Sequence, residues 1–140
     1  MRIHYCNEDV TAPKLQKRKI TSWIRETIHS EGKKSGEISF IFCSDNYLLG
    51  VNKQYLNHDY FTDIITFDYV ENDIISGDIF ISCDRVKENT TEFKTTFENE
   101  LSRIIIHGVL HLLGYKDKIK KDKLLMTQKE DFYLALLSNS

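Results

Sequence analysis

The sequence HGVLHLLGYKD, residues 107–117, carries two histidines four positions apart inside an apolar, helix-like segment. On an α-helix such residues share one face, with Cβ atoms roughly 5 to 6 Å apart, which suits two imidazoles that bind one ion. Gly114 can take the left-handed conformation that ends a helix, so the chain can turn back after it. Asp117 could then reach the same ion. Three protein ligands leave one coordination position for water or substrate, which is typical of a catalytic zinc site.

The helix that would carry the histidines is apolar on nearly every side, as at Leu101, Ile105 and Leu112. Thr95 and Glu98 have the spacing of a capping box and predict a helix start just ahead of Leu101. We therefore expect this helix to be buried against a sheet. Two neutral imidazoles in such surroundings need polar partners, which a metal ion supplies. The alternative is that both histidines are satisfied core residues, which predicts no stoichiometric metal.

Strand-like and helix-like segments alternate upstream of this helix. We predict strands over residues 2–6 and 37–43 and two more that start at Ile64 and Gly77. Further helices are predicted from Pro13 to a stop at Gly32, from Ser44 or Asp45 to about Leu56, after a cap at Asp84, and over residues 119–137. One face of the first helix comprises Ile20, Trp23, Ile24, Thr27 and Ile28, and one side of the last helix comprises Leu125, Phe132 and Leu136.

These elements predict a single α+β domain over residues 1–140. Its sheet should be mixed and mostly parallel, with about four strands packed against about five helices, one of them a zincin-like metal-binding helix. The strands that start at Ile64 and Gly77 could form a hairpin or lie apart. A chain of 140 residues is long enough to bury one core without disulfides.

The composition excludes several classes of protein. Hydrophobic residues make up 41% of the chain and charged residues 29%, which argues against extended disorder. The first ten residues lack the apolar region of a secretory signal, and no stretch approaches the roughly 20 apolar residues of a membrane span, so we expect a cytoplasmic protein without membrane contact. The net charge of −2 gives no general sign of nucleic-acid binding. Either a solvated face or a phosphate-binding patch is formed by Lys116, Lys118, Lys120, Lys121 and Lys123.

The pattern HxxxHxxGxxD is similar to the HExxHxxGxxH pattern of metzincin peptidases, in which the third position binds the same zinc. Those enzymes use the glutamate after the first histidine as a general base. Here that position is Gly108, which has no side chain to accept a proton. Peptide hydrolysis of the metzincin type is therefore poorly supported.

Several motifs together resemble the YbeY family of bacterial rRNA maturation factors, metal-dependent endoribonucleases associated with ribosome assembly. The motif HGVLHLLGY is preceded by Glu100 and Leu101 and followed by Met126. The upstream features that match in order and spacing are Asn52, Tyr55, Asp59, TDIITF at residues 62–67 and GDIFIS at residues 77–82. The resemblance therefore spans about residues 51–126.

The resemblance implies that His107, His111 and Asp117 bind the metal, and it leaves the catalytic residues unassigned. The family pattern typically ends in an Asp-His pair whose histidine is the third zinc ligand, whereas this chain has Lys116 and Asp117. A carboxylate makes the set harder, so we expect one divalent ion, zinc first, with iron, manganese or nickel as alternatives. The family also typically has an arginine implicated in activity where this chain has Leu56, and Lys116 could substitute for it.

The function implied by the resemblance is single-strand-specific endoribonuclease activity in rRNA maturation, with metal-bound water as the nucleophile. The expected partners are rRNA of the small ribosomal subunit and ribosomal or assembly proteins. A groove along the strands from Ile64 and Gly77 could seat the RNA backbone. Asp63, Asp78 and Glu100 could support the ligands, or only close turns and satisfy backbone groups. A non-catalytic ribosome assembly factor with a structural metal is the rival function, which the missing arginine favours.

Overall fold

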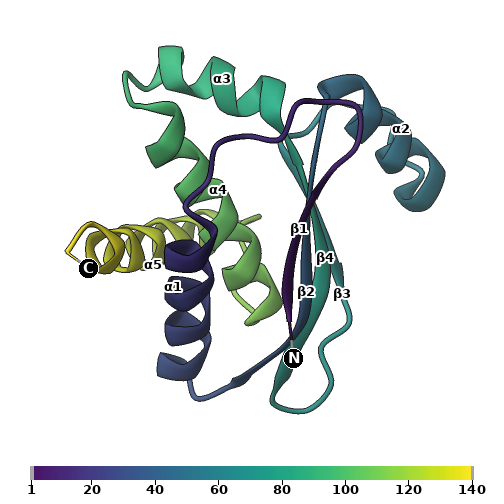
Figure 1. Ribbon diagram of the computed structural model, residues 1–140. Coiled ribbons are helices and arrows are strands. Elements are labelled where there is room, and N and C mark those ends of the chain that lie inside the picture. Colours follow the sequence, from purple (N-terminus) through teal and green to yellow (C-terminus); the bar gives the residue numbers. More distant parts are fainter. Residues whose placement is uncertain (1, 140) are drawn as a thin grey trace.

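A four-stranded sheet lies at the centre of the protein, with helices on both of its faces (Figure 1). The structure is a computed structural model and describes residues 2–139. The strands are β1 (Ile3–Asn7), β2 (Lys34–Cys43), β3 (Ile64–Asp68) and β4 (Ile74–Ser82). The helices are α1 (Lys17–Ser30), α2 (Asp45–Leu56), α3 (Cys83–Glu92), α4 (Phe97–Leu112) and α5 (Lys120–Ser138).

The strand order across the sheet is β1-β2-β4-β3. β2 pairs in parallel with β1 and with β4, whereas β3 pairs antiparallel with β4. β3 and β4 form a hairpin, whose turn is closed by a bridge between Glu71 and Ile74. The predicted α+β class with a mixed, mostly parallel sheet is therefore confirmed, and the hairpin is the correct one of the two arrangements left open.

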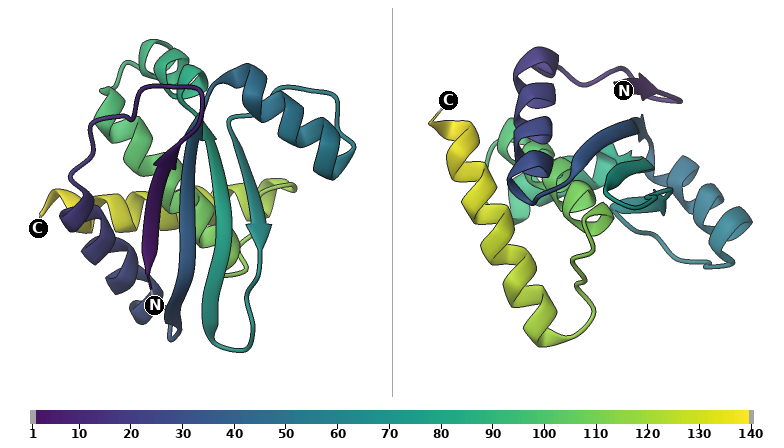
Figure 2. Two further views of the ribbon diagram at one scale, coloured as in Figure 1. Left: turned by 45° about the vertical axis from the view of Figure 1, so that its right-hand side comes forward. Right: turned by 90° about the horizontal axis from the view of Figure 1, so that it is seen from below.

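The helices form unequal layers on the two faces of the sheet. α1 and α4 pack on one face, and α5 crosses them on the side away from the sheet, as both views of Figure 2 show. α2 covers part of the opposite face, where a smaller cluster contains Cys43, Leu48, Val51 and Ile65. Within residues 2–139, no helix is long and apolar enough to cross a membrane.

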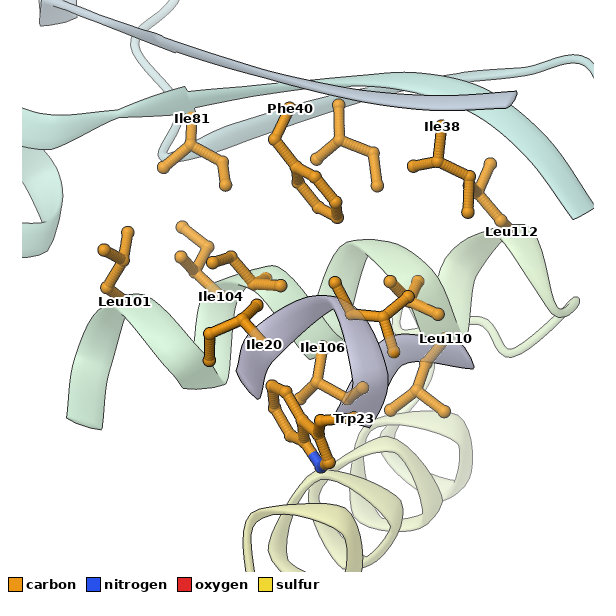
Figure 3. Packing of buried hydrophobic residues seen from close by; sticks show 14 of the residues in the cluster. Ile20, Trp23, Ile38, Phe40, Ile81, Leu101, Ile104, Ile106, Leu110 and Leu112 are labelled. Atoms are coloured by element: carbon orange, nitrogen blue, oxygen red, sulfur yellow. The ribbon is translucent and has the colours of Figure 1, made fainter. Parts of the chain in front are cut away.

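The main core lies between the sheet, α1 and α4 (Figure 3). Ile38, Phe40 and Ile81 project from the strands toward the helices, and all three are fully buried. Trp23 of α1 reaches α5 on the other side, where its indole N–H donates a hydrogen bond to the carbonyl oxygen of Tyr133 at 2.8 Å. This buried bond fixes the outermost helix against the inner pair.

The sequence predicted most of these elements from local chemistry. The five residues assigned to the inner face of α1 are all buried, and Gly32 follows the helix with a φ of +79°. Ser44 caps α2, because its hydroxyl accepts from the backbone N–H of Tyr47 at 3.1 Å. β1 and β2 lie within a few residues of their predicted limits.

The start of α1 was predicted wrongly. The helix begins at Lys17, and Pro13 belongs to an irregular connection ahead of it. Val10 and Leu15 both pack against the main core from this connection. These contacts hold residues 11–16 in an irregular path ahead of the helix.

Two helix caps were also assigned to the wrong residue. Ser82 caps α3, whereas Asp84 lies in the first turn and accepts from the backbone N–H of Asp45 at 2.8 Å. Asp84 thus serves the start of α2 instead of its own helix. Thr96, not Thr95, caps α4, and its hydroxyl accepts from the backbone N–H three residues further on at 3.1 Å.

The face assigned to α5 was wrong. The buried residues of this helix are Met126, Glu130 and Tyr133. The side chains that were expected to share its inner side are instead between 43% and 57% exposed: Leu125, Phe132 and Leu136. The helix is turned by two polar anchors, since Tyr133 receives the indole N–H of α1 and Glu130 pairs with Arg103 of α4 at 2.7 Å.

Candidate metal centre

α4 is buried on most sides, and the side chains of its two histidines are partly exposed to solvent. The side chains of His107 and His111 are 20% and 26% exposed. Between them, Gly108 faces the sheet at close range. A Cβ atom at this position would lie 2.9 Å from Cγ2 of Ile79 and 3.1 Å from Cδ1 of Ile64. Any side chain would force these isoleucines to shift, so the glycine permits the close packing of α4 on β3 and β4.

The turn after α4 brings the third predicted ligand back to the histidines. Gly114 has a φ of +104°, a conformation that is strained for any residue with a side chain. Oδ2 of Asp117 then lies 3.2 Å from Nε2 of His107 and 3.3 Å from Nε2 of His111. The two Nε2 atoms are 2.9 Å apart. Ligand atoms arranged tetrahedrally at about 2.0 to 2.1 Å from an ion are about 3.3 Å from one another, so these three residues could hold one metal ion.

Each imidazole has its second ring nitrogen engaged by an oxygen atom. Nδ1 of His107 lies 2.6 Å from Oε2 of Glu130, and Nδ1 of His111 lies 3.0 Å from the carbonyl oxygen of Tyr115. Carboxylate and carbonyl oxygens accept hydrogen bonds, so each Nδ1 carries a hydrogen, and in the neutral form of each ring Nε2 presents a lone pair. Two lone pairs and the carboxylate of Asp117 therefore converge on one point. This donor set fits a divalent cation, which removes the repulsion among them.

Glu130 was missed by the sequence analysis. It is 7% exposed, and Arg103 of α4 donates to its Oε1 at 2.7 Å while also pairing with Asp131 at 2.7 Å. A buried carboxylate is stable only when it is paired, and Glu130 has both an arginine and a histidine partner. The available signal was its spacing of four and three positions from Met126 and Tyr133, which places an acidic residue on the inner face of an amphipathic helix.

The two histidines differ in their electrostatic surroundings. Burial alone would lower the pKa of His107, but the hydrogen bond and negative charge of Glu130 outweigh it and raise the pKa above its ordinary value. The pKa of His111 is lowered, first by burial and then by the neighbouring His107, and its Nδ1 faces a neutral carbonyl group. His107 is consequently the ligand whose basicity is increased by a carboxylate.

Three further acidic residues are candidates from the sequence for supporting the proposed ligands. Asp63 and Glu100 line the same groove as His107, and burial raises the pKa of both carboxyl groups. Asp78 lies elsewhere, where its carboxylate accepts from the hydroxyl of Tyr69 at 3.1 Å. Asp63 interacts electrostatically with His107 and Asp117, whereas Glu100 lines the same groove beside Arg103, and the expectation for Asp78 is not supported.

A groove beside His107 runs along α4, between α3 and α5. The groove expected to seat RNA along the strands that start at Ile64 and Gly77 is a different surface, and that expectation stays a prediction. Arg103 in the wall of the groove along α4 is neutralised by two carboxylates.

The predicted lysine group is exposed, and none of its members forms an ion pair within residues 2–139: Lys116, Lys118, Lys120, Lys121 and Lys123.

Aromatic side chains gather on the segment that leads from α2 into β3. Tyr55, Tyr60 and Phe61 are 63%, 56% and 46% exposed. The ring of His58 stacks on that of Tyr60, with centroids 5.1 Å apart and an interplanar angle of 21°. The guanidinium of Arg85 lies 5.4 Å from the centroid of Phe61. We refer to Tyr55, His58, Tyr60 and Phe61 as the aromatic segment. It ends two positions before Asp63, which lines the groove.

Comparison with known proteins identifies the family to which this chain belongs. The model of the family described as endoribonuclease YbeY matches residues 4–138. The chain belongs to the YbeY family. An endoribonuclease YbeY from Phocaeicola vulgatus is 51% identical over 136 residues, which cover 97% of this chain and 99% of the relative. One from Flavobacterium psychrophilum is 58% identical over 115 residues, with 82% of each chain covered.

A solved structure supports the fold of this YbeY family member. The solution structure of TM1509 from Thermotoga maritima superposes with a TM-score of 0.70 at 29% sequence identity. The match covers 97% of this chain and 89% of the other. The resemblance noted from the motifs at residues 51–126 is therefore confirmed, and it extends over nearly the whole chain.

Proposed function

We propose that this protein is a metal-dependent endoribonuclease that hydrolyses phosphodiester bonds of single-stranded RNA. The observation that carries the proposal is the convergence of three metal-binding atoms, on His107, His111 and Asp117, with both imidazoles already oriented by hydrogen bonds through Nδ1. The relatives that match nearly the whole chain are named endoribonucleases. Together, the arrangement and the relatives favour RNA hydrolysis over other reactions of a three-ligand centre.

Each residue of the centre has a separate role in the proposed hydrolysis. His107, His111 and Asp117 would hold the ion, which when bound supplies Lewis acidity toward water and toward a phosphoryl oxygen. Glu130 keeps His107 in the tautomer that presents Nε2. Asp63 lies beside the ligands in the groove with a pKa raised by burial. We assign its carboxyl group the role of accepting the proton released from the attacking water, since Gly108 cannot.

The RNA would be held by two surfaces of different chemistry. The exposed lysines that follow Asp117 form no ion pair with any other residue of the described chain, so their positive charge attracts phosphate groups. The aromatic segment offers rings on which unpaired bases stack, a contact that a base-paired strand cannot make. These two features favour a single-stranded substrate, although the net charge of the whole chain is −2.

The biological setting follows from the same proposal. We propose that residues 1–140 form one catalytic domain, that the substrate is rRNA of the small ribosomal subunit, and that ribosomal or assembly proteins are its partners in the cytoplasm. Zinc is the first choice for the ion, because two imidazoles and one carboxylate form a common catalytic zinc set. Iron, manganese and nickel are the alternatives that a carboxylate ligand admits.

A non-catalytic ribosome assembly factor is the second candidate function. Leu56, where the family pattern typically has an arginine, is 39% exposed at the end of α2. Arg85 near the aromatic segment is ion-paired with Asp45 at 3.0 Å, and Lys116 is exposed without an ion pair within the described chain. Lys116 is therefore our candidate for the missing positive charge. A metzincin-like peptidase is disfavoured, because Gly108 provides neither a base nor space for one.

Cleavage of a defined RNA tests the proposal directly. Purified protein is stripped with a chelator, resupplied with Zn²⁺ or Mn²⁺, and incubated with a single-stranded oligonucleotide and with the matching duplex. We expect metal-dependent cleavage of the single strand only, and its loss in Asp117→Ala. Cleavage that survives both the chelator and the substitution would disprove the metal mechanism. Binding to small ribosomal subunits without cleavage in any divalent ion would establish the assembly factor instead.

A further inference from the structure

Tyr115 connects the metal centre to a distant part of the fold. Its backbone carbonyl oxygen accepts the hydrogen bond from Nδ1 of His111 at 3.0 Å. Its side-chain hydroxyl donates to Oε1 of Glu31 at 2.6 Å, across 84 residues of sequence. One residue thus orients a ligand with its backbone while its side chain is held by the segment that follows α1.

Glu31 is the centre of a small polar network. Its carboxylate also accepts hydrogen bonds from the hydroxyl of Tyr133 and from the ammonium of Lys129, the latter at 3.4 Å. The side chain is 15% exposed, and the ammonium of Lys129 lies 5.4 Å from the ring centroid of Tyr115. Burial raises the pKa of Glu31, but the hydrogen bonds of the two tyrosines and the charge of Lys129 outweigh it and lower the pKa. The group is therefore a carboxylate at neutral pH.

The turn that carries the third ligand depends on this anchor. α4 ends at Leu112, Gly114 reverses the chain with a φ of +104°, and Asp117 follows only two residues after Tyr115. The neighbouring side chains of Lys116 and Lys118 are exposed. Leu113 and the ring of Tyr115 pack against the main core. The hydrogen bond from Tyr115 to Glu31 is the polar contact that adds a fixed direction to this attachment.

We propose that Glu31 is a positioning residue of the metal centre, which acts through Tyr115 to orient His111 and to place Asp117. This role rests on the proposed function, since it concerns the affinity of the same centre for its ion. Partners that orient a metal ligand typically contribute 10- to 100-fold to metal affinity. Glu31 is one step further away and acts on two ligands, so we expect a loss of about tenfold when its contact with Tyr115 is removed.

Two matched substitutions separate positioning from general stability. Tyr115→Phe and Tyr133→Phe each remove one phenolic hydroxyl from the same carboxylate, but only Tyr115 carries the carbonyl group that faces His111. The dissociation constants for Zn²⁺ and Co²⁺ are measured by competition with a chromophoric chelator, and the visible absorption of bound Co²⁺ reports the coordination geometry. Thermal unfolding of the metal-free proteins is measured in parallel.

We expect Tyr115→Phe to weaken metal binding about tenfold and to change the Co²⁺ spectrum. The metal affinity of Tyr133→Phe should stay within about twofold of that of the unsubstituted protein. This should hold even if Tyr133→Phe loses as much thermal stability as Tyr115→Phe. Glu31→Ala should repeat the effect of Tyr115→Phe, and Glu31→Gln should restore part of the affinity, because an amide oxygen still accepts from the hydroxyl. If Tyr115→Phe does not fold, the comparison between Glu31→Ala and Glu31→Gln decides the question.

Two results would overturn the inference while leaving the proposed function intact. In the first, Tyr115→Phe and Glu31→Ala bind metal as tightly as the unsubstituted protein. In the second, Tyr115→Phe and Tyr133→Phe lose affinity equally, which would assign the network to stability alone. If the unsubstituted protein binds no Zn²⁺ or Co²⁺, the proposed function fails and the inference fails with it.

Discussion

Nδ1 of His107 and Oε2 of Glu130 lie 2.6 Å apart, although 23 residues separate them in the chain. The outermost helix, α5, therefore orients a candidate ligand on α4 from the side away from the sheet. Arg103, one turn before His107 on α4, holds the other oxygen of the same carboxylate at 2.7 Å. The two helices are joined by an arginine, a glutamate and a histidine in contact with one another, and the histidine belongs to the candidate metal centre.

Substitution of Glu130 by glutamine should weaken metal binding by about 10- to 100-fold. The amide retains an acceptor for Nδ1 of His107 but loses the charge that makes the imidazole a better ligand and that pairs with Arg103. Zinc affinity measured by chelator competition checks this expectation. Asp131→Asn is the control, since it removes a carboxylate from the same arginine at an exposed site. Equal losses in both variants would show that the effect arises from Arg103 instead of His107.

Substitution of Asp117 should reveal how far the carboxylate sets the choice of ion. Asp117→Ala should abolish stoichiometric metal binding, because only two of the three ligands, the imidazoles, remain. Asp117→His should retain the ion and favour zinc, since imidazole is the softer ligand. The ratio of the Mn²⁺ to the Zn²⁺ dissociation constant should rise by at least about tenfold. Elemental analysis and competition titrations of the three proteins provide the measurement. An unchanged ratio would mean that Asp117 does not bind the ion.

Loss of one ring from the aromatic segment should weaken the binding of single-stranded RNA. Stacking of a base on an aromatic side chain contributes about 1 to 3 kcal/mol, so Phe61→Ala should raise the dissociation constant of a short single strand by at least about fivefold. Fluorescence anisotropy with an Asp117→Ala background avoids cleavage during the measurement. Phe132→Ala, which removes an exposed ring from α5, should leave binding unchanged. Equal effects of the two substitutions would exclude a specific stacking surface.

The stability of the protein should depend on Glu31 in acid. Its pKa lies below the ordinary value of 4.5, because the hydrogen bonds of Tyr115 and Tyr133 and the charge of Lys129 outweigh burial. A carboxyl group with a lowered pKa stabilises the folded state above its unfolded pKa, and this contribution is lost as the pH falls through the folded value. The free energy of unfolding in urea should therefore fall more steeply below about pH 4.5 than that of Glu31→Gln. Parallel curves for the two proteins would contradict this assignment.

The sequence was most informative where a few local residues decide the structure. The spacing of His107 and His111, the turn at Gly114 and the serine cap of α2 each depend on neighbours in the chain, and the structure has all of them. The strand and helix order followed in the same way from patterns of apolar residues. Hydrophobic spacing also located the inner face of α1.

The sequence was least informative where contacts between distant elements decide. The buried side of α5 was wrong because an ion pair with Arg103 and a backbone contact with Trp23 turn the helix, and neither is visible in the residues of α5 alone. Glu130 was missed for the same reason, since an acidic residue on a helix is more often exposed. Glu31 contacts the turn at Tyr115 from 84 positions away, and no local pattern encodes such a distance.

The glycine of α4 that packs against Ile64 and Ile79 of the sheet also limits what protein engineering can make of this helix. Replacing Gly108 with glutamate, to supply the base of a peptidase, would first bring a Cβ atom within 2.9 Å of Ile79 and 3.1 Å of Ile64. Room would have to be made by truncating isoleucine side chains, and a truncation to alanine in a core destabilises a protein by about 2 to 5 kcal/mol. In this scaffold, the separation between two hydrolytic chemistries is therefore set by the packing of a helix on a sheet, while the ion itself could serve both.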